Sequence, residues 1–189
     1  DMRYSLLIIL VVLGVTTKAQ VPEYVPTDGL IAWYPMDGNA LDESDNQHHG
    51  TLDGATPSMN RFGQPFHAYS FNGVNDKISI ENEVLLNLVG DWSISFWMQP
   101  ETGVQTIAYP HVFEWDDPES DVHLIVHRKG ENAYPESGGQ MECYMTDFSG
   151  YQNPSVSPRI WNALPSVGEW SHAVIVRVDG EMTFFLNGE

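Results

Sequence analysis

The chain has 189 residues, of which 42% are hydrophobic and 12% aromatic, so it can bury a sizeable core and is too apolar to remain disordered. Its 26 acidic residues outnumber its 8 basic residues and give a formal net charge of −18 at pH 7. Because this charge would repel a duplex phosphate backbone, we expect no nucleic-acid partner and interpret the acidity as a solvated surface.

The first 19 residues have the pattern of a secretory signal peptide. Arg3 precedes an unbroken apolar run over residues 6–15, and the small residues Thr17 and Ala19 suit cleavage after Ala19. The run is about half the length that a membrane-spanning helix needs, roughly 20 residues. We therefore expect an exported chain that is secreted or held at the cell surface, with no membrane span in its mature part.

Residues 20–28 predict an extended linker, because Pro22 and Pro26 restrict their own backbone and that of the residue before each. The folded domain is then expected over residues 29–189. The end of the chain, Asn187-Gly188-Glu189, has the residues of a hairpin turn without a following strand. We therefore expect a domain that is incomplete at its C-terminus and belongs to a longer protein.

The domain predicts an all-β fold. Residues 92–99 alternate apolar and polar side chains, the period of a strand with one buried face. Asp179-Gly180 predicts a tight hairpin between two further strands. Residues 130–167 are rich in Gly, Pro, Ser and Asn and predict long loops around a single strand. The predicted strands are 30–36, 92–99, 106–115, 121–128, 140–146, 170–178 and 182–186, with strand, Asn-Gly turn and strand over 71–80.

Four phrases occur in order along this domain: "WYPMDGNALDESDNQHHGTL", "RFGQPFHAYSFNGVNDKISI", "DWSISFWMQPETG" and "GEWSHAVIVRVDGEMTFFLNGE". Together they resemble a laminin-G-like (concanavalin A-like) jelly-roll domain, over residues 29–189. The resemblance implies a two-sheet antiparallel jelly-roll sandwich, often with a structural calcium ion, that serves as a secreted recognition module.

The loop that follows residues 30–36 is dense in oxygen donors. Asp37, Asn39 and Asp42 have the spacing with which a turn can wrap side chains and carbonyls about one Ca²⁺, and carboxylates and amides favour calcium over zinc. Backbone carbonyls near His49 or Ala68 would complete the set, and the resemblance implies a further acidic residue on a later strand. The alternative is a solvated acidic turn, since Asp and Asn also cap turns without a metal.

Aromatic residues in or beside the predicted loops are candidates for stacking on sugar rings. We predict ligand binding at Trp115, Tyr151 and Trp161, because sugar C–H faces pack on flat apolar rings. Tyr109 and Tyr134 are further candidates. The strand residues Trp33, Trp97 and Trp170 are expected to pack instead, and the single cysteine, Cys143, to be a buried inert thiol.

Glu114, Asp116 and Glu119 match the Glu-x-Asp-x-x-Glu spacing of laminarinase-type glucanases, which share the jelly-roll fold. That resemblance implies two catalytic glutamates with an aspartate between them. Asp117 and Pro118, however, favour a turn at this point. We therefore expect a non-catalytic module that binds a glycan or an extracellular protein, with a glucanase-like hydrolase and a structural spacer of an adhesin as alternatives.

Overall fold

The computed structural model describes residues 21–80, 90–101, 111–117, 122–129, 140–146, 159–163 and 166–189. These residues form strands and no helix, and every strand ladder among them is antiparallel, which confirms the all-β prediction. The strands are β1 (Gly50–Asp53), β2 (Thr56–Met59), β3 (Pro65–Ser70), β4 (Lys77–Ile80), β5 (Trp92–Met98), β6 (His111–Asp117), β7 (Val122–Lys129), β8 (Gln140–Thr146), β9 (Arg159–Ala163), β10 (Ser171–Val178) and β11 (Glu181–Leu186).

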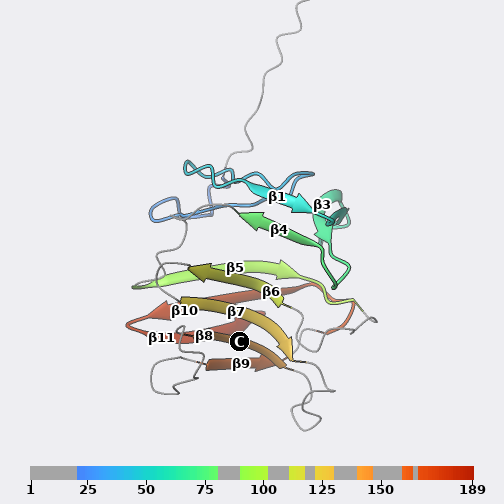
Figure 1. The fold of residues 1–189 in the computed structure, drawn as a ribbon. Helices are drawn as coiled ribbons and strands as arrows, with labels where there is room; N and C mark the ends of the chain where they lie inside the picture. The colour runs from blue at the N-terminus through green and yellow to red at the C-terminus, as the bar shows by residue number, and fades with distance from the viewer. Residues whose placement is uncertain are drawn as a thin grey trace, which may run out of the picture.

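Two larger sheets, with strand orders β11-β10-β5 and β6-β7-β8-β9, form the two layers of a sandwich (Figure 1). Two smaller pairs, β1-β4 and β2-β3, come from the N-terminal part of the described chain and lie above these layers in the view of Figure 1. The core lies between the layers and consists of Met141, Cys143, Ala173, Ile175, Met182, Phe184 and Leu186. This arrangement confirms the predicted antiparallel sandwich and the burial of Cys143.

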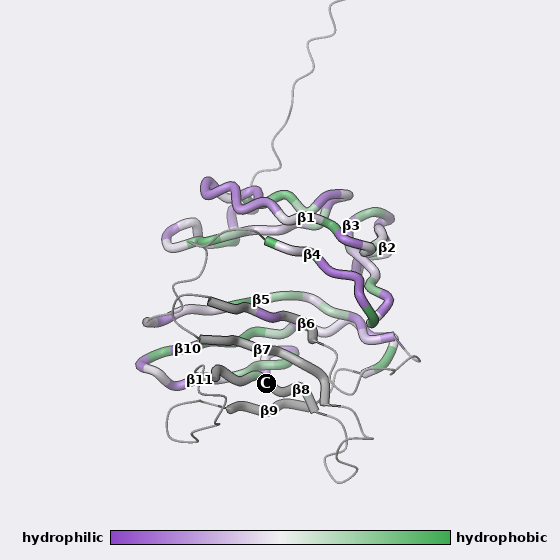
Figure 2. The backbone as a smooth tube through the Cα atoms, in the orientation of Figure 1, coloured by the Kyte–Doolittle hydropathy of each residue, from purple (hydrophilic) through white to green (hydrophobic). Residues whose placement is uncertain are grey.

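In strand β5, the alternation of apolar and polar residues predicts which face packs against the core. Its apolar residues Trp92, Ile94, Phe96 and Met98 pack against the core, while the residues between them face outward. The alternation of two faces along a strand produces this pattern directly. Figure 2 shows that several loops of the N-terminal part are hydrophilic.

The predicted hairpin between β10 and β11 is present. Asp179 (φ 50°) and Gly180 (φ 85°) both have positive φ, as a two-residue type I′ turn requires. Asp179 also donates its backbone N–H to Asp91 Oδ1 at 2.9 Å, which ties this turn to the residue before β5. At the end of the chain, Leu186 and Glu189 exchange two backbone hydrogen bonds of 2.9 and 3.2 Å, so the turn predicted there is formed as well.

Residues 30–36 do not form the predicted strand. Their backbone groups bond to side chains of the following loop instead of to a neighbouring strand. Asn46 Nδ2 donates to the carbonyls of Leu30 (2.9 Å) and Ile31 (2.8 Å). An apolar, aromatic composition favours an extended chain but does not provide the partner that a strand needs.

The N-terminal linker is not extended as predicted. The backbone N–H of Val25 donates to the carbonyl of Pro22 (2.8 Å), and that of Leu30 to the carbonyl of Thr27 (3.2 Å), so two turns follow each other. The predicted signal peptide lies outside the described residues. No helix within the described residues is long and apolar enough to cross a membrane.

Three further predictions are corrected. The turn at Asn72-Gly73 is present, but the strands beside it are not a hairpin, since β3 pairs with β2 and β4 pairs with β1. Strand β9 lies in the region predicted as long loops and pairs with β8. Strand β6 continues to Asp117, two residues beyond the predicted end of the strand at residue 115.

Candidate functional site

The polar loop of residues 37–49 is built around the carboxylate of Asp42, which is only 2% exposed. Its Oδ1 accepts hydrogen bonds from the backbone N–H groups of Trp33 (2.8 Å) and Ser44 (2.9 Å). Its Oδ2 accepts hydrogen bonds from Ser44 Oγ (2.8 Å) and from the backbone N–H of His48 (2.8 Å). These four donors fill the roughly four lone-pair positions of a carboxylate.

The electrostatics of the loop keep this carboxylate charged. Burial alone would raise the pKa of Asp42, but the hydrogen bonds that its oxygens accept outweigh burial and hold the pKa below its ordinary value. Burial raises the pKa of the nearby Tyr34, and the negative charge of Asp42 raises it further. The Tyr34 hydroxyl therefore stays protonated and donates to the carbonyl of His48 at 2.5 Å.

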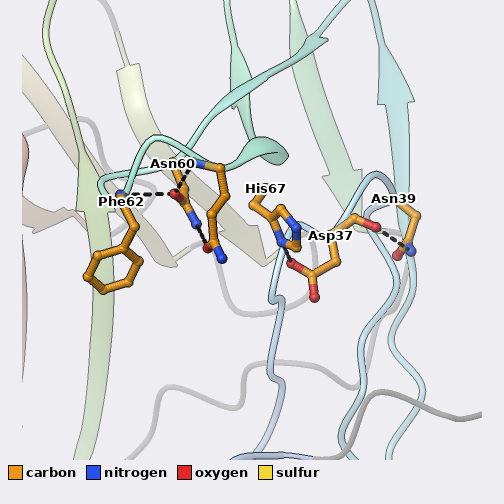
Figure 3. A network of polar contacts seen from close by, with 6 residues as sticks. Asp37, Asn39, Asn60, Phe62 and His67 are labelled. Atoms are coloured by element: carbon orange, nitrogen blue, oxygen red, sulfur yellow. Dashed lines mark hydrogen bonds and ion pairs between the residues drawn. The ribbon is translucent and has the colours of Figure 1, made fainter.

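The other two predicted calcium ligands bind protein partners as well (Figure 3). Asp37 Oδ1 is hydrogen-bonded to His67 Nδ1. Asn39 Nδ2 donates to the backbone carbonyl of Asp37 (3.2 Å), and Asn39 Oδ1 accepts from the backbone N–H of Leu41 (2.8 Å). The loop is therefore ordered by hydrogen bonds among its own residues.

These contacts bear on whether Asp37, Asn39 and Asp42 fit a calcium ion. As arranged, Asp42 does not fit as a ligand, because N–H and O–H donors already occupy its lone pairs. Within the described residues, no group of three or more His, Cys, Asp or Glu side chains is placed to hold a metal ion. The calcium site stays a prediction, and the order of the loop has an explanation that needs no metal.

The structure brings two members of the glucanase-like triplet onto one strand. Glu114 and Asp116 lie in β6, paired with Ile125 and His123 of β7. Glu114 is exposed. The third member, Glu119, lies outside the described residues.

Two of the predicted sugar-binding residues lie in strands, as the predicted strand 106–115 implied for Trp115 but not for Trp161. Trp115 lies in β6 opposite Leu124, and Trp161 lies in β9 opposite Glu142. The prediction for Trp161 placed it in a loop because β9 was not recognised from the sequence. The remaining candidates, Tyr109, Tyr134 and Tyr151, lie outside the described residues.

A different aromatic group is exposed on the outer face of the β11-β10-β5 sheet. Trp97 of β5 lies directly opposite His172 of β10, and their rings stack with centroids 4.9 Å apart and an interplanar angle of 18°. The expectation that Trp97 packs in the core is wrong, because the residue is 44% exposed. Its neighbours Phe96 and Met98 occupy the core-facing side of the strand.

Arg61, at the tip of the β2–β3 hairpin, joins this stack. Its guanidinium carbon lies 4.5 Å from the ring centroid of Trp97 and 4.3 Å from that of Phe62, both within the range of a cation–π contact. The Phe62 side chain is 70% exposed. We refer to Arg61, Phe62, Trp97 and His172 as the aromatic platform.

His172 is held in place by two polar contacts. Its Nε2 lies 2.8 Å from Ser95 Oγ, and its backbone N–H donates to Asn187 Oδ1 at 2.9 Å. Burial lowers the pKa of His172 below its ordinary value, and the positive charge of Arg61 lowers it further. His172 is therefore neutral at pH 7, and Arg61 carries the positive charge of the platform.

The hairpin tip that presents Arg61 and Phe62 is fixed by Asn60 (Figure 3). Asn60 Oδ1 accepts hydrogen bonds from the backbone N–H groups of Phe62 (2.9 Å) and Gln64 (3.1 Å), and Asn60 Nδ2 donates to Gln64 Oε1 (2.9 Å). The backbone N–H of Gly63 donates to the Asn60 carbonyl at 2.9 Å. The tip is thus ordered before any ligand arrives, which lowers the entropic cost of binding.

One part of the platform carried a signal in the sequence. Trp97 belongs to the polar set of the β5 alternation, together with Ser93, Ser95 and Gln99, so the period of two already placed its ring on the solvent side. The contact with Arg61 carried no such signal, because the two residues are distant in the sequence and meet through the fold alone.

A family model described as the concanavalin A-like lectin/glucanases superfamily matches residues 72–189, more than half of the chain. The matched segment begins after β3 and includes Trp97 and His172, but not Arg61 or Phe62. Comparison with curated proteins and with solved structures gives no significant match.

Proposed function

Because the chain belongs to the concanavalin A-like lectin/glucanase superfamily, we propose that it is an exported, non-catalytic recognition module that binds a glycan through its aromatic platform. Membership of this superfamily supports a role in binding carbohydrate or protein, and laminin-G-like domains are common in extracellular and surface proteins. The signal-like pattern of residues 1–19 supports export.

The observation that carries the proposal is the exposed Phe62 ring in contact with a guanidinium whose N–H groups have no partner among the described residues. Phe62 presents apolar surface on which the C–H face of a sugar can pack, whereas the Trp97 ring is stacked with His172 and contacted by Arg61. Among the described residues, the Arg61 guanidinium donates no hydrogen bond, so its N–H groups can bind sugar hydroxyls. A stacking surface flanked by a few polar groups is the usual composition of a sugar site.

The non-catalytic assignment is supported by the same geometry. The platform contains no pair of carboxylates, and glycoside hydrolysis usually requires two of them across the scissile bond. Glu114 and Asp116 lie on the other large sheet, in β6. The glucanase-like alternative therefore depends on residues outside the platform, and release of reducing sugar tests it separately.

The proposal is tested by probing the full chain against an array of neutral and acidic glycans. We expect binding that Phe62→Ala weakens roughly tenfold or more, since stacking on one ring contributes about 0.5–1.5 kcal/mol beyond the burial of its area. Phe66→Ala is the matched control, because Phe66 is exposed to a similar degree (64%) and is not part of the platform. Equal loss in both variants, or no binding to any glycan, would contradict the proposal and favour the spacer alternative.

A further inference from the structure

Arg61 is an unusual cation in a chain with 26 acidic and 8 basic residues. Elsewhere in the described residues, Lys77 lies 4.0 Å from Asp53, and Arg177 donates to the backbone carbonyl of Gly90. The Arg61 guanidinium, by contrast, makes no ion pair or hydrogen bond with any described residue. Its contacts are with two aromatic rings, and such contacts do not use the N–H groups.

This arrangement leaves an oriented hydrogen-bonding edge. A guanidinium is a planar group with five N–H donors in a fixed geometry, and it matches the two oxygens of a carboxylate in a bidentate pair. The rings of Phe62 and Trp97 restrict the position of the Arg61 group, so less side-chain entropy remains to be lost when an anion binds. The guanidinium carbon lies over the Phe62 ring, 4.3 Å from its centroid, and Phe62 is itself exposed.

We propose that the platform recognises a sugar that carries a carboxylate, with the carboxylate on Arg61 and the sugar ring on Phe62. This inference rests on the proposed function and names its ligand class. His172 does not compete for the carboxylate as a second cation at pH 7, because its pKa is lowered.

The overall acidity limits the length of such a ligand. A net charge of −18 repels a long polyanion, but charges farther away than about 8 Å are largely screened at physiological ionic strength. A short oligosaccharide places one carboxylate on Arg61 and has few further carboxylates for the acidic protein to repel. We therefore expect recognition of short acidic oligosaccharides, or of acidic chain ends, rather than of long polyuronates at low salt.

The test compares oligogalacturonates of three to five sugars with the same oligosaccharides after methyl esterification, which keeps the ring and removes the charge. Titration calorimetry with the full chain at physiological ionic strength measures both affinities. We expect the ester to bind roughly tenfold more weakly than the acid, as is typical for loss of a charged hydrogen-bonding partner.

Variants of Arg61 assign this preference to its side chain. Arg61→Gln should remove the preference for the acid, and Arg61→Lys should restore only part of it, because a lysine keeps the charge but not the planar fork. Arg177→Gln is the matched control, since Arg177 of β10 is an arginine outside the platform with a backbone partner of its own. Unchanged melting temperatures would exclude a loss of folding as the cause.

The outcomes separate this inference from the proposed function. Equal affinity for acid and ester, or binding of neutral glycans alone, would overturn the carboxylate inference and leave glycan recognition standing. An acid preference that survives Arg61→Gln would overturn the assignment to Arg61. Absence of binding to every glycan would overturn both.

Discussion

Replacing Asp42 by Ala should destabilise the domain severely, because one side chain satisfies four donors. The change leaves the backbone N–H groups of Trp33, Ser44 and His48 without their acceptor at partly or fully buried positions. Each unsatisfied donor costs about 1–3 kcal/mol, and the costs are not additive. Removing one partner from a buried charged network typically costs about 3–5 kcal/mol, which we take as the expected loss.

The assay is thermal unfolding of the full chain. In a domain of 150–250 residues, each kcal/mol shifts the melting temperature by roughly 2–4 °C, so Asp42→Ala should lower it by about 6–20 °C. Asp42→Asn keeps one acceptor oxygen and should lose about half as much. Asp45→Ala is the matched control, because Asp45 is an exposed acid of the same loop.

The loss should be the same in EDTA and in millimolar calcium, since the donors that Asp42 satisfies belong to the protein. An Asp42→Ala variant that melts within about 2 °C of the parent would refute this account of the loop. A destabilisation that occurs only in the presence of calcium would show instead that the carboxylate acts through a metal.

Three other predictions concern calcium, pH and catalysis. If the predicted calcium site exists, calcium at 100 times its dissociation constant should stabilise the domain by about 2.7 kcal/mol and raise the melting temperature by roughly 5–10 °C. Asp37→Ala should abolish this rise, and Asp116→Ala should preserve it. Equal melting temperatures in EDTA and in calcium would exclude the site. The folded-state pKa of His172 lies below the ordinary 6.5, so the unfolded chain binds more protons between the two values. Stability should therefore fall as the pH drops below about 6.5, and the fall should be smaller in His172→Gln; an identical pH profile for both proteins would contradict this. Laminarin and lichenan should release no reducing sugar, and turnover that Glu114→Gln abolishes would establish the glucanase-like alternative instead.

The sequence predicted those elements whose pattern is local. Strand β8 has the bounds predicted for it, and β5 and β10 differ from their predicted bounds by one residue. In β5 the period of two is sufficient, and the turn at Asp179-Gly180 fixes the pairing of β10 with β11. The bounds of these strands, and the turn between β10 and β11, follow from residues that are close in the sequence, whereas the pairing of β5 with β10 does not.

Elements that depend on distant partners could not be predicted in this way. Asn72 Oδ1 accepts hydrogen bonds from the backbone N–H groups of Val74 (2.8 Å), Asn75 (3.0 Å) and Asp76 (3.2 Å), so the turn itself follows from the local sequence. The pairing of the flanking strands with β2 and β1 does not. A local pattern identifies the turn, whereas the register depends on which strand arrives beside it.

The same distinction separates the acidic loop from the aromatic platform. The density of Asp and Asn suggested a metal site. The fold, however, buries Asp42 and supplies its carboxylate with four hydrogen-bond donors, so the negative charge of Asp42 has a structural role. Arg61 is the opposite case, an exposed cation that the fold positions against two rings and leaves without an acceptor among the described residues. A buried charge with all its partners stabilises the fold, whereas an oriented, exposed charge without a partner can bind a ligand. This contrast is why we assign recognition to Arg61 rather than to the acidic loop.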